Sequence, residues 1–224
     1  MNQNCPSPHL KQYNLFSWEP DGSRSPDENY MDIVMFLTRS SQLRQGSMGC
    51  IIVKPDQSRQ SDQSKKDEGF DKAEFFNSII GASTNQSLFN HNDSDIHAEI
   101  ATLGECLQHG RSTKDCTIFI TMPPCKRCFG AIVSAGIKRI VSNRDFPEII
   151  QDGAKARNIE LVSMDSALCY EQQNRINNLI RLESSAGETS SVSEERKRRK
   201  DERKRRKKIG EDELNKTEAK QQKL

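Results

Sequence analysis

The second half of the chain alternates between helical and strand-like segments, and this alternation limits the possible folds more than any other feature of the sequence. Branched apolar runs predict strands at 116–121, 139–142 and 159–164, and apolar residues at helical spacing predict helices at 97–108, 126–135 and 146–157. A single helix between successive strands makes a crossover connection, so these strands should be parallel neighbours in one sheet. The pattern predicts an α/β fold, a three-layer α/β/α sandwich.

The first half of the chain adds one helix and two more strand-like runs. The sequence Ser25-Pro26-Asp27-Glu28 combines an N-cap, a proline at the first helical position and a capping-box acid, which predicts a helix at about 25–43. Apolar runs at 48–53 and 75–80 predict two buried strands in an antiparallel hairpin, so the sheet is expected to be mixed, with about five strands. The polar stretch at about 56–71 between them is expected to be a solvated insertion.

The two ends of the chain differ in composition from this central part. Residues 1–24 contain prolines and a glycine but no apolar periodicity, which indicates an irregular lead-in. A last helix at 166–182 is expected to pack through four apolar side chains, those of Leu168, Ile176, Leu179 and Ile180. Residues 183–224 are poor in apolar residues and are expected to form a basic tail that is disordered or a solvated helix. The folded domain is therefore predicted to span residues 25–182.

Composition and cysteine usage exclude several classes of protein. Hydrophobic residues make up 33% of the chain, and no apolar run approaches the roughly 18 residues that would span a membrane. The N-terminus lacks the basic start and apolar core of a signal peptide. Seven cysteines are an odd number, which argues against a secreted disulfide scaffold. An intracellular protein is expected, in which the close pair Cys125 and Cys128 indicates metal or redox chemistry.

Three side chains match the ligand set of a catalytic zinc site. His97 opens one expected helix, and Cys125 and Cys128 open the next helix after a strand. Two thiolates and an imidazole suit the borderline-soft zinc ion, and three protein ligands leave a fourth position for water. The cysteines are spaced i and i+3 at a helix start, where the helix dipole favours thiolates. The sequence therefore predicts zinc held by His97, Cys125 and Cys128.

Glu99 is the residue expected to move protons at this site. It lies two residues after His97, roughly 200° around a helix, and so should face the water on the metal rather than bind the metal. A Cys-x-x-Cys pair alone would fit a structural zinc half-site or a redox pair, but neither requires His97-Ala98-Glu99 upstream. The remaining histidines and cysteines are expected to be structural or solvated.

The order H-x-E followed by P-C-x-x-C is the signature of zinc-dependent deaminases of nucleosides, nucleotides and nucleobases. Residues 25–164 resemble the cytidine and deoxycytidylate deaminase superfamily through three segments, IIGASTN (79–85), HAEI (97–100) and TMPPCKRCFGAIVSAGIKRIV (121–141). The resemblance implies that the side chain of Asn85 contacts the sugar of the substrate and that the backbone of Ala98 contacts the base. It also implies attack by zinc-bound hydroxide with release of ammonia.

The resemblance favours a cytosine base in a nucleotide such as CMP or dCMP as the substrate. The segment AGIKRIV (135–141) looks most like the deoxycytidylate type, and Pro123 stands where tRNA adenosine deaminases commonly have glutamate. One alternative is a nucleic-acid editing deaminase that acts on tRNA adenosine or on polynucleotide cytidine. A second is a catalytically silent zinc-binding partner subunit, against which the retained Glu99 argues.

The basic tail is compatible with several partners and with more than one location in the cell. Residues 184–224 hold 14 Lys and Arg against 9 Asp and Glu, and the cluster at 196–208 is a candidate for contact with RNA or DNA. A nuclear-localisation signal and a solvated charged helix explain the same residues. We expect the protein in the nucleus, the cytoplasm or both, and as a homo-oligomer or heterodimer.

Overall fold

The computed structural model describes residues 7–41, 43, 46–55, 70–89 and 93–187, with the backbone alone for 184–187. The chain divides into two compact units, residues 1–179 and 180–224, and the sheet lies in the first unit. Among the described helices, none is both long and apolar enough to cross a membrane.

The first unit is built on one mixed sheet of five strands in the order β2-β1-β3-β4-β5. Strand β1 is antiparallel to both β2 and β3, whereas β3, β4 and β5 run parallel to one another. The strands are β1 (Gly49–Val53), β2 (Ile79–Thr84), β3 (Thr117–Ile120), β4 (Arg139–Ser142) and β5 (Glu160–Ser163). The prediction of a mixed five-stranded sheet with an antiparallel hairpin and parallel strands is confirmed.

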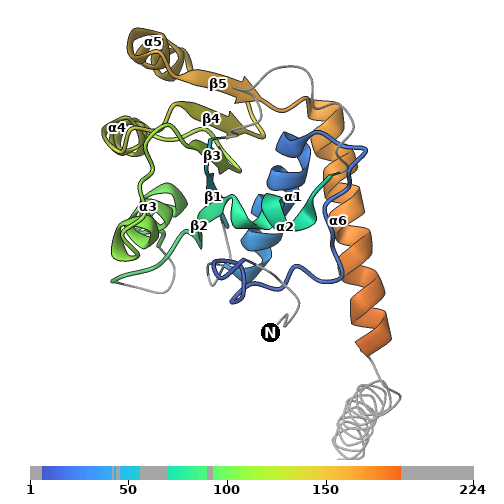
Figure 1. Ribbon diagram of the computed structural model, residues 1–224. Helices are drawn as coiled ribbons and strands as arrows, with labels where there is room; N and C mark the ends of the chain where they lie inside the picture. Colours follow the sequence, from blue (N-terminus) through green and yellow to red (C-terminus); the bar gives the residue numbers. More distant parts are fainter. Residues whose placement is uncertain (1–6, 42, 44–45, 56–69, 90–92, 188–224) are drawn as a thin grey trace, which may run out of the picture. The chain divides into compact units, whose positions relative to one another are not determined.

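Helices cover both faces of this sheet, which makes the predicted three layers (Figure 1). Helix α1 (Pro26–Ser40) packs on one face, where the Tyr30 and Phe119 rings lie 5.1 Å apart. The opposite face carries α3 (Ala98–Gln108), α4 (Lys126–Ser134) and α5 (Glu148–Arg157). Because side chains alternate along a strand, Ile118 and Ile120 of β3 point into this second core while Phe119 points to α1.

The predicted strand at 75–80 is wrong over its first half. Residues Lys72–Asn77 form the short helix α2, and β2 begins only at Ile79. The carboxylate of Asp71 caps this helix by accepting hydrogen bonds from the backbone N–H groups of Ala73 and Glu74. Phe75 therefore packs as a helical residue, and its ring stacks on Tyr30 with centroids 4.3 Å apart. Most of the expected insertion, 56–69, lies outside the described residues.

Two glycines allow helices to approach the sheet closely on its opposite faces. A Cβ atom on Gly49 of β1 would lie 2.4 Å from the Val34 carbonyl oxygen in α1. A Cβ atom on Gly81 of β2 would lie 2.5 Å from the Cys106 sulfur in α3. Both positions need glycine because any side chain would push the helix away from the sheet.

Helix α6 (Ser166–Gly187) packs mainly through polar side chains in the part that belongs to the first unit. Ile176 is fully buried as expected, but Leu168 is 39% exposed, so its predicted packing is wrong. Arg175 forms an ion pair with the buried Asp32 of α1, and Gln172 donates to the same carboxylate at 2.7 Å. This network joins α6 to α1 across more than a hundred residues of sequence.

The N-terminal segment 7–24 contains neither helix nor strand but is packed against the domain. Leu10, Leu15 and Trp18 are buried, and the Trp18 indole N–H donates to Asp32 at 3.0 Å. A buried indole that finds such a partner anchors the segment in one place. The segment is irregular in structure and contributes side chains to the core of the first unit.

Candidate metal centre and catalytic site

The candidate site lies where the N-termini of α3 and α4 meet beside the carboxyl end of β3. Helix α3 leads into β3 and α4 leads away from it, so both helices begin at the same edge of the sheet. His97 is the N-cap residue of α3 and Cys125 is the N-cap residue of α4. Cys128 lies in the first turn of α4, and its backbone N–H donates a hydrogen bond to the Cys125 sulfur. The fold thus joins two motifs that are 28 residues apart.

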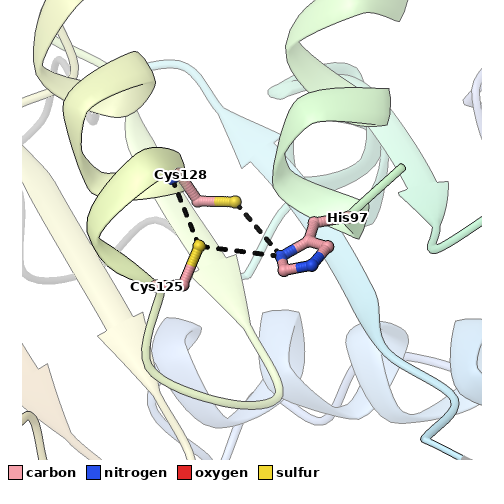
Figure 2. A group of neighbouring side chains, drawn as sticks. All are labelled: His97, Cys125 and Cys128. Atoms are coloured by element: carbon pink, nitrogen blue, oxygen red, sulfur yellow. Dashed lines mark hydrogen bonds between the residues drawn. The ribbon is translucent and has the colours of Figure 1, made fainter. Parts of the chain in front are cut away.

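The three side chains have the spacing of ligands around a single tetrahedral ion. His97 Nδ1 lies 3.8 Å from the Cys125 sulfur and 3.4 Å from the Cys128 sulfur. Figure 2 shows that the imidazole ring faces both sulfur atoms. The three potential ligand atoms all lie within 4.8 Å of one another. Tetrahedral zinc, with Zn–S near 2.3 Å and Zn–N near 2.0 Å, separates a sulfur and a nitrogen ligand by about 3.5 Å. The donor set and its spacing therefore fit zinc.

Burial and a neighbouring charge determine the protonation state of the Cys128 thiol. Burial, followed by the charge of Glu99, raises the pKa of the Cys128 thiol well above its ordinary value. A thiol with such a pKa stays protonated at neutral pH unless a cation stabilises the thiolate. The position of both cysteines at the positive end of the α4 dipole contributes in the same direction as a metal would. When no metal is bound, the Cys128 thiol is therefore neutral at physiological pH.

Glu99 forms a hydrogen bond with Cys128, lies near the charge of His97 and is only 8% exposed. Burial raises the pKa of its carboxyl group above the ordinary value, while its own backbone N–H, the charge of His97 and a hydrogen bond with Cys128 act in the opposite direction. Its carboxyl group therefore keeps a proton to higher pH than a solvated glutamate does. The role of Glu99 in proton transfer stays a prediction.

Ala98 and Asn85, the two residues predicted to bind the substrate, are both buried. The backbone of Ala98 begins α3, and the His97 cap makes no side-chain hydrogen bond to the first turn of that helix. The N–H group at the first helical position has no partner within the helix backbone, so the Ala98 N–H is suited to bind a ligand. Asn85 follows β2, is 2% exposed, and uses its side-chain amide in hydrogen bonds to other parts of the protein. The substrate contacts of both residues stay predictions.

Comparison with known sequences identifies the family to which this site belongs. The family described as the cytidine and deoxycytidylate deaminase zinc-binding region matches residues 24–143, more than half of the 224-residue chain. The chain belongs to this deaminase family. Zinc is the metal of the family, and His97, Cys125 and Cys128 form the cluster that fits it.

Individual relatives differ in the base on which they act. A tRNA-specific adenosine deaminase of Buchnera aphidicola subsp. Schizaphis graminum is 38% identical over 80 residues, which cover 34% of this chain and 50% of that protein. A cytosine deaminase of Candida albicans is 28% identical over 95 residues, which cover 42% of this chain and 63% of that protein. The chain therefore spans between half and two thirds of the length of these relatives.

A solved structure of similar fold is the dCMP deaminase of cyanophage S-TIM5 in its apo form. It is 20% identical, with a TM-score of 0.47, and the match covers 62% of this chain and 96% of that one.

Two cations, Lys126 and Arg127, lie between the two cysteines of the cluster. Lys126 and Arg127 occupy the first two positions of α4 and are exposed. Within the described part of the chain, neither side chain has a hydrogen-bond or ion-pair partner. Cations are disfavoured by about 0.3–1 kcal/mol at the positive end of a helix dipole, so the local structure gives no reason for them. The sequence does contain a sign of these two residues, because positive charges at a predicted helix N-terminus are unfavourable and therefore suggest a role outside the helix.

The other histidines and cysteines that the structure describes lie in structural settings. His9 is buried and pairs with Glu105 at 2.7 Å, and His109 bonds to the backbone oxygen of Glu105. Cys50, Cys106 and Cys116 are buried free thiols. Burial raises the pKa of Cys106 to about 12, which leaves this thiol neutral and inert at physiological pH. These observations agree with the structural roles expected from the sequence.

Proposed function

We propose that the protein is a zinc-dependent hydrolytic deaminase that converts cytosine to uracil in a nucleotide such as CMP or dCMP. The observation that carries the proposal is the buried Glu99 beside the cluster of His97, Cys125 and Cys128. A carboxyl group held against a three-ligand metal position is the arrangement that hydrolytic removal of an amine requires. The match to the deaminase family supports the reaction class.

In this proposal His97, Cys125 and Cys128 hold the metal and Glu99 moves the protons. Zinc, when bound, supplies Lewis acidity that brings the pKa of a coordinated water to about 7. Glu99 accepts a proton from the attacking water and returns it to the ring nitrogen of the base. It then takes the second proton of that water from the hydroxyl group added to the base and delivers it to the exocyclic amine, so that the C–N bond breaks, a carbonyl forms and ammonia leaves. Water and the amino base are consumed, and the oxo base and ammonia are formed.

Ala98 and Asn85 are the proposed substrate-binding residues. The Ala98 N–H begins α3 without help from a side-chain cap, which supports a hydrogen bond from this backbone to the base. A contact of Asn85 with the sugar would have to replace a hydrogen bond that its amide already makes within the protein. The proposal for Asn85 is therefore the weaker of the two.

Lys126 and Arg127 support a substrate that carries phosphate. Their charges lie between two metal ligands, in the first turn of α4, with no partner among the described residues. An anionic group within about 10 Å is attracted by such charges at an ionic strength near 0.1 M. A nucleotide phosphate that lies near the mouth of the site would satisfy them.

A second candidate function is deamination of adenosine in tRNA. It is favoured by the 38% identity to a tRNA-specific adenosine deaminase over 80 residues. Whichever substrate is correct, we also propose that the basic cluster at 196–208 contacts RNA or DNA or acts as a nuclear signal, and that the protein assembles as a homo-oligomer or heterodimer. The cluster at 196–208 lies outside the described residues. A catalytically silent subunit is disfavoured because Glu99 is retained and buried.

Ammonia release from a panel of substrates tests the proposal. The zinc-loaded full-length protein is assayed with cytosine, cytidine, CMP, dCMP, adenosine, single-stranded DNA and tRNA, and the Glu99→Gln variant serves as the control for contaminating activity. We expect turnover of a cytosine nucleotide that exceeds turnover of cytidine. Activity on tRNA alone, with inosine as the product, would establish the second candidate instead.

A further inference from the structure

Strand β2 lies at one end of the sheet, and yet all six of its residues are buried. Strand β1 pairs with one side of β2, and within the described part of the chain no strand pairs with its other side. An end strand of this kind normally presents unpaired N–H and C=O groups to solvent. Ala82, in the middle of β2, is 0% exposed. A part of the protein other than a strand therefore covers this edge.

Three side chains bond to backbone groups of β2 on the side away from β1. The Tyr13 hydroxyl donates to the Ala82 carbonyl at 3.1 Å, and the Glu105 carboxylate accepts from the Ala82 N–H at 2.9 Å. The Arg111 guanidinium donates to the Ile80 carbonyl at 2.9 Å. Each contact joins a donor to an acceptor, because a carboxylate only accepts and a guanidinium only donates. These side chains take the positions that the backbone of a further strand would occupy.

His9 ties the segment 7–24 to two of these side chains. Its Nδ1 lies 2.7 Å from one Glu105 oxygen, while the other Glu105 oxygen holds the Ala82 N–H. The Arg111 guanidinium contacts the His9 ring as well. A neutral imidazole that donates from Nδ1 and accepts at Nε2 satisfies both neighbours. His9 is only 7% exposed, so it holds Glu105 and Arg111 against β2 from a buried position.

The same segment also reaches the helix on the opposite face of the sheet. Helices α1 and α3 cover opposite faces (Figure 1). His9 is bonded to α3, whereas the Trp18 indole N–H donates to Asp32 of α1 at 3.0 Å. Tyr13, which lies between them in the sequence, bonds to β2 itself. Segment 7–24 therefore runs from one helical layer to the other past the edge of β2.

The sequence of β2 makes this edge prone to pair with another strand when it is uncovered. Its residues, IIGAST, include no charge and no proline, and half of them are β-branched. A short uncharged run of this kind at an open sheet edge is a template for strand pairing. Two copies of one edge are self-complementary about a two-fold axis. With the axis at Ala82, the N–H and C=O groups of the two Ala82 residues would bond to each other as in an antiparallel pair.

We propose that segment 7–24 is a clasp that closes the β2 edge, and that release of the clasp opens β2 to antiparallel pairing with β2 of a second copy of the chain. The clasp joins the two helical layers and keeps the edge strand from self-association. This role is independent of the reaction proposed above.

The double variant His9→Leu and Tyr13→Phe tests the inference, because it removes two polar contacts of the clasp and keeps apolar side chains in their place. Hydrogen exchange of the Ala82 amide is followed by NMR, with the amide of Ile118 in the interior of the sheet as the reference for general destabilisation. In dilute solution we expect the Ala82 amide, relative to Ile118, to exchange about 10-fold faster than in wild type, the effect of losing one hydrogen bond to a charged group. In concentrated solution we expect larger species by sedimentation velocity and renewed protection of Ala82, because its amide is then paired with a second copy.

Ile150→Ala is the matched control. Ile150 is buried in α5, which packs against β5 at the other end of the sheet, so this variant should lose stability and keep the wild-type size at every concentration. Tyr13→Phe alone keeps the inference testable if the double variant does not fold, and it should show the same changes to a smaller extent. Wild-type exchange of Ala82 together with wild-type size in the variants that fold would overturn the inference. So would association in which the Ala82 amide still exchanges rapidly, or equal association of Ile150→Ala.

Discussion

Replacement of Glu99 with glutamine separates proton transfer from metal binding at this site. Glutamine keeps the size and polarity of the side chain, which is 8% exposed, so the packing around it should not change. It cannot accept or deliver a proton at any pH in the working range. The reaction needs several proton transfers, from the attacking water, to the ring nitrogen and to the leaving amine. Glu99 is the only side chain in the His97-Ala98-Glu99 triplet that could carry them all.

The expected loss follows from the burial of Glu99 beside the metal position. A positioned acid or base contributes roughly 10²–10⁴-fold to a rate, which corresponds to about 3–5 kcal/mol in the activation free energy. Zinc binding should survive, because the charge of Glu99 is one of the causes that raise the pKa of the Cys128 thiol. Without that charge the thiolate forms more easily. Turnover should therefore fall by two to four orders of magnitude in a protein that still holds its metal.

The assay measures zinc content, melting temperature and turnover of the best substrate for wild type and Glu99→Gln. Glu99→Asp is the matched control, since it keeps the carboxyl group and shortens its reach, and it should retain more activity than Glu99→Gln. If Glu99→Gln keeps more than about a tenth of the wild-type turnover, the acid–base role is wrong, because that loss is smaller than a positioned proton donor predicts. Loss of zinc together with activity would assign Glu99 to the metal instead.

Four further predictions follow from individual residues. Cys125→Ala should lose its zinc, and near-stoichiometric zinc in a metal analysis of the purified variant would contradict the ligand assignment. The double variant Lys126→Gln and Arg127→Gln should raise KM for CMP several-fold and leave KM for cytidine unchanged; equal changes for both substrates would rule out a phosphate contact. Burial raises the pKa of Tyr13 from 10.0 to about 12, so its neutral form stabilises the fold fully below pH 10. That stabilisation, about 2–3 kcal/mol, is lost as the pH rises through 12, and urea titrations should show a smaller loss in Tyr13→Phe than in wild type, because buried thiols such as Cys106 contribute to the loss in both proteins. Truncation at Ser184 should leave the melting temperature and the turnover of a free nucleotide nearly unchanged, and a large fall in either would show that the tail supports the domain.

The sequence predicted most of the fold because its signals there are local. The capping box at Ser25 and Glu28 is present in the structure and begins α1 at the expected residue. The alternation of apolar runs and amphipathic segments predicted the parallel strands β3, β4 and β5 and the helices between them. The strand prediction at 75–80 was partly wrong because aromatic and branched residues favour strands on average. In the structure Asp71 caps the helix α2 instead, and the ring of Phe75 in that helix stacks on Tyr30.

The candidate metal ligands were predictable for a similar reason. His97, Cys125 and Cys128 are fixed by short motifs at two helix starts, and the order of helices and strands brings both starts to the carboxyl end of β3. Lys126 and Arg127 lie in the same motif, but a pattern that names the cysteines says nothing of the residues between them. The proposed phosphate contact of Lys126 and Arg127 depends on their lack of partners among the described residues, which cannot be predicted from a sequence pattern.

Contacts that depend on the folded arrangement could not be predicted in this way. Arg175 meets Asp32 across 143 residues, and Asn85 bonds to residues on both sides of it in the sequence, up to 44 positions away. A buried polar group is stabilised only when every partner is in place, so the sequence around one member carries no signal of the others. The resemblance to a family assigned Asn85 to the substrate from its position in a motif. The four hydrogen bonds that its amide makes within the protein arise only in the folded chain, because their partners lie up to 44 positions away, so no motif around Asn85 could have predicted them.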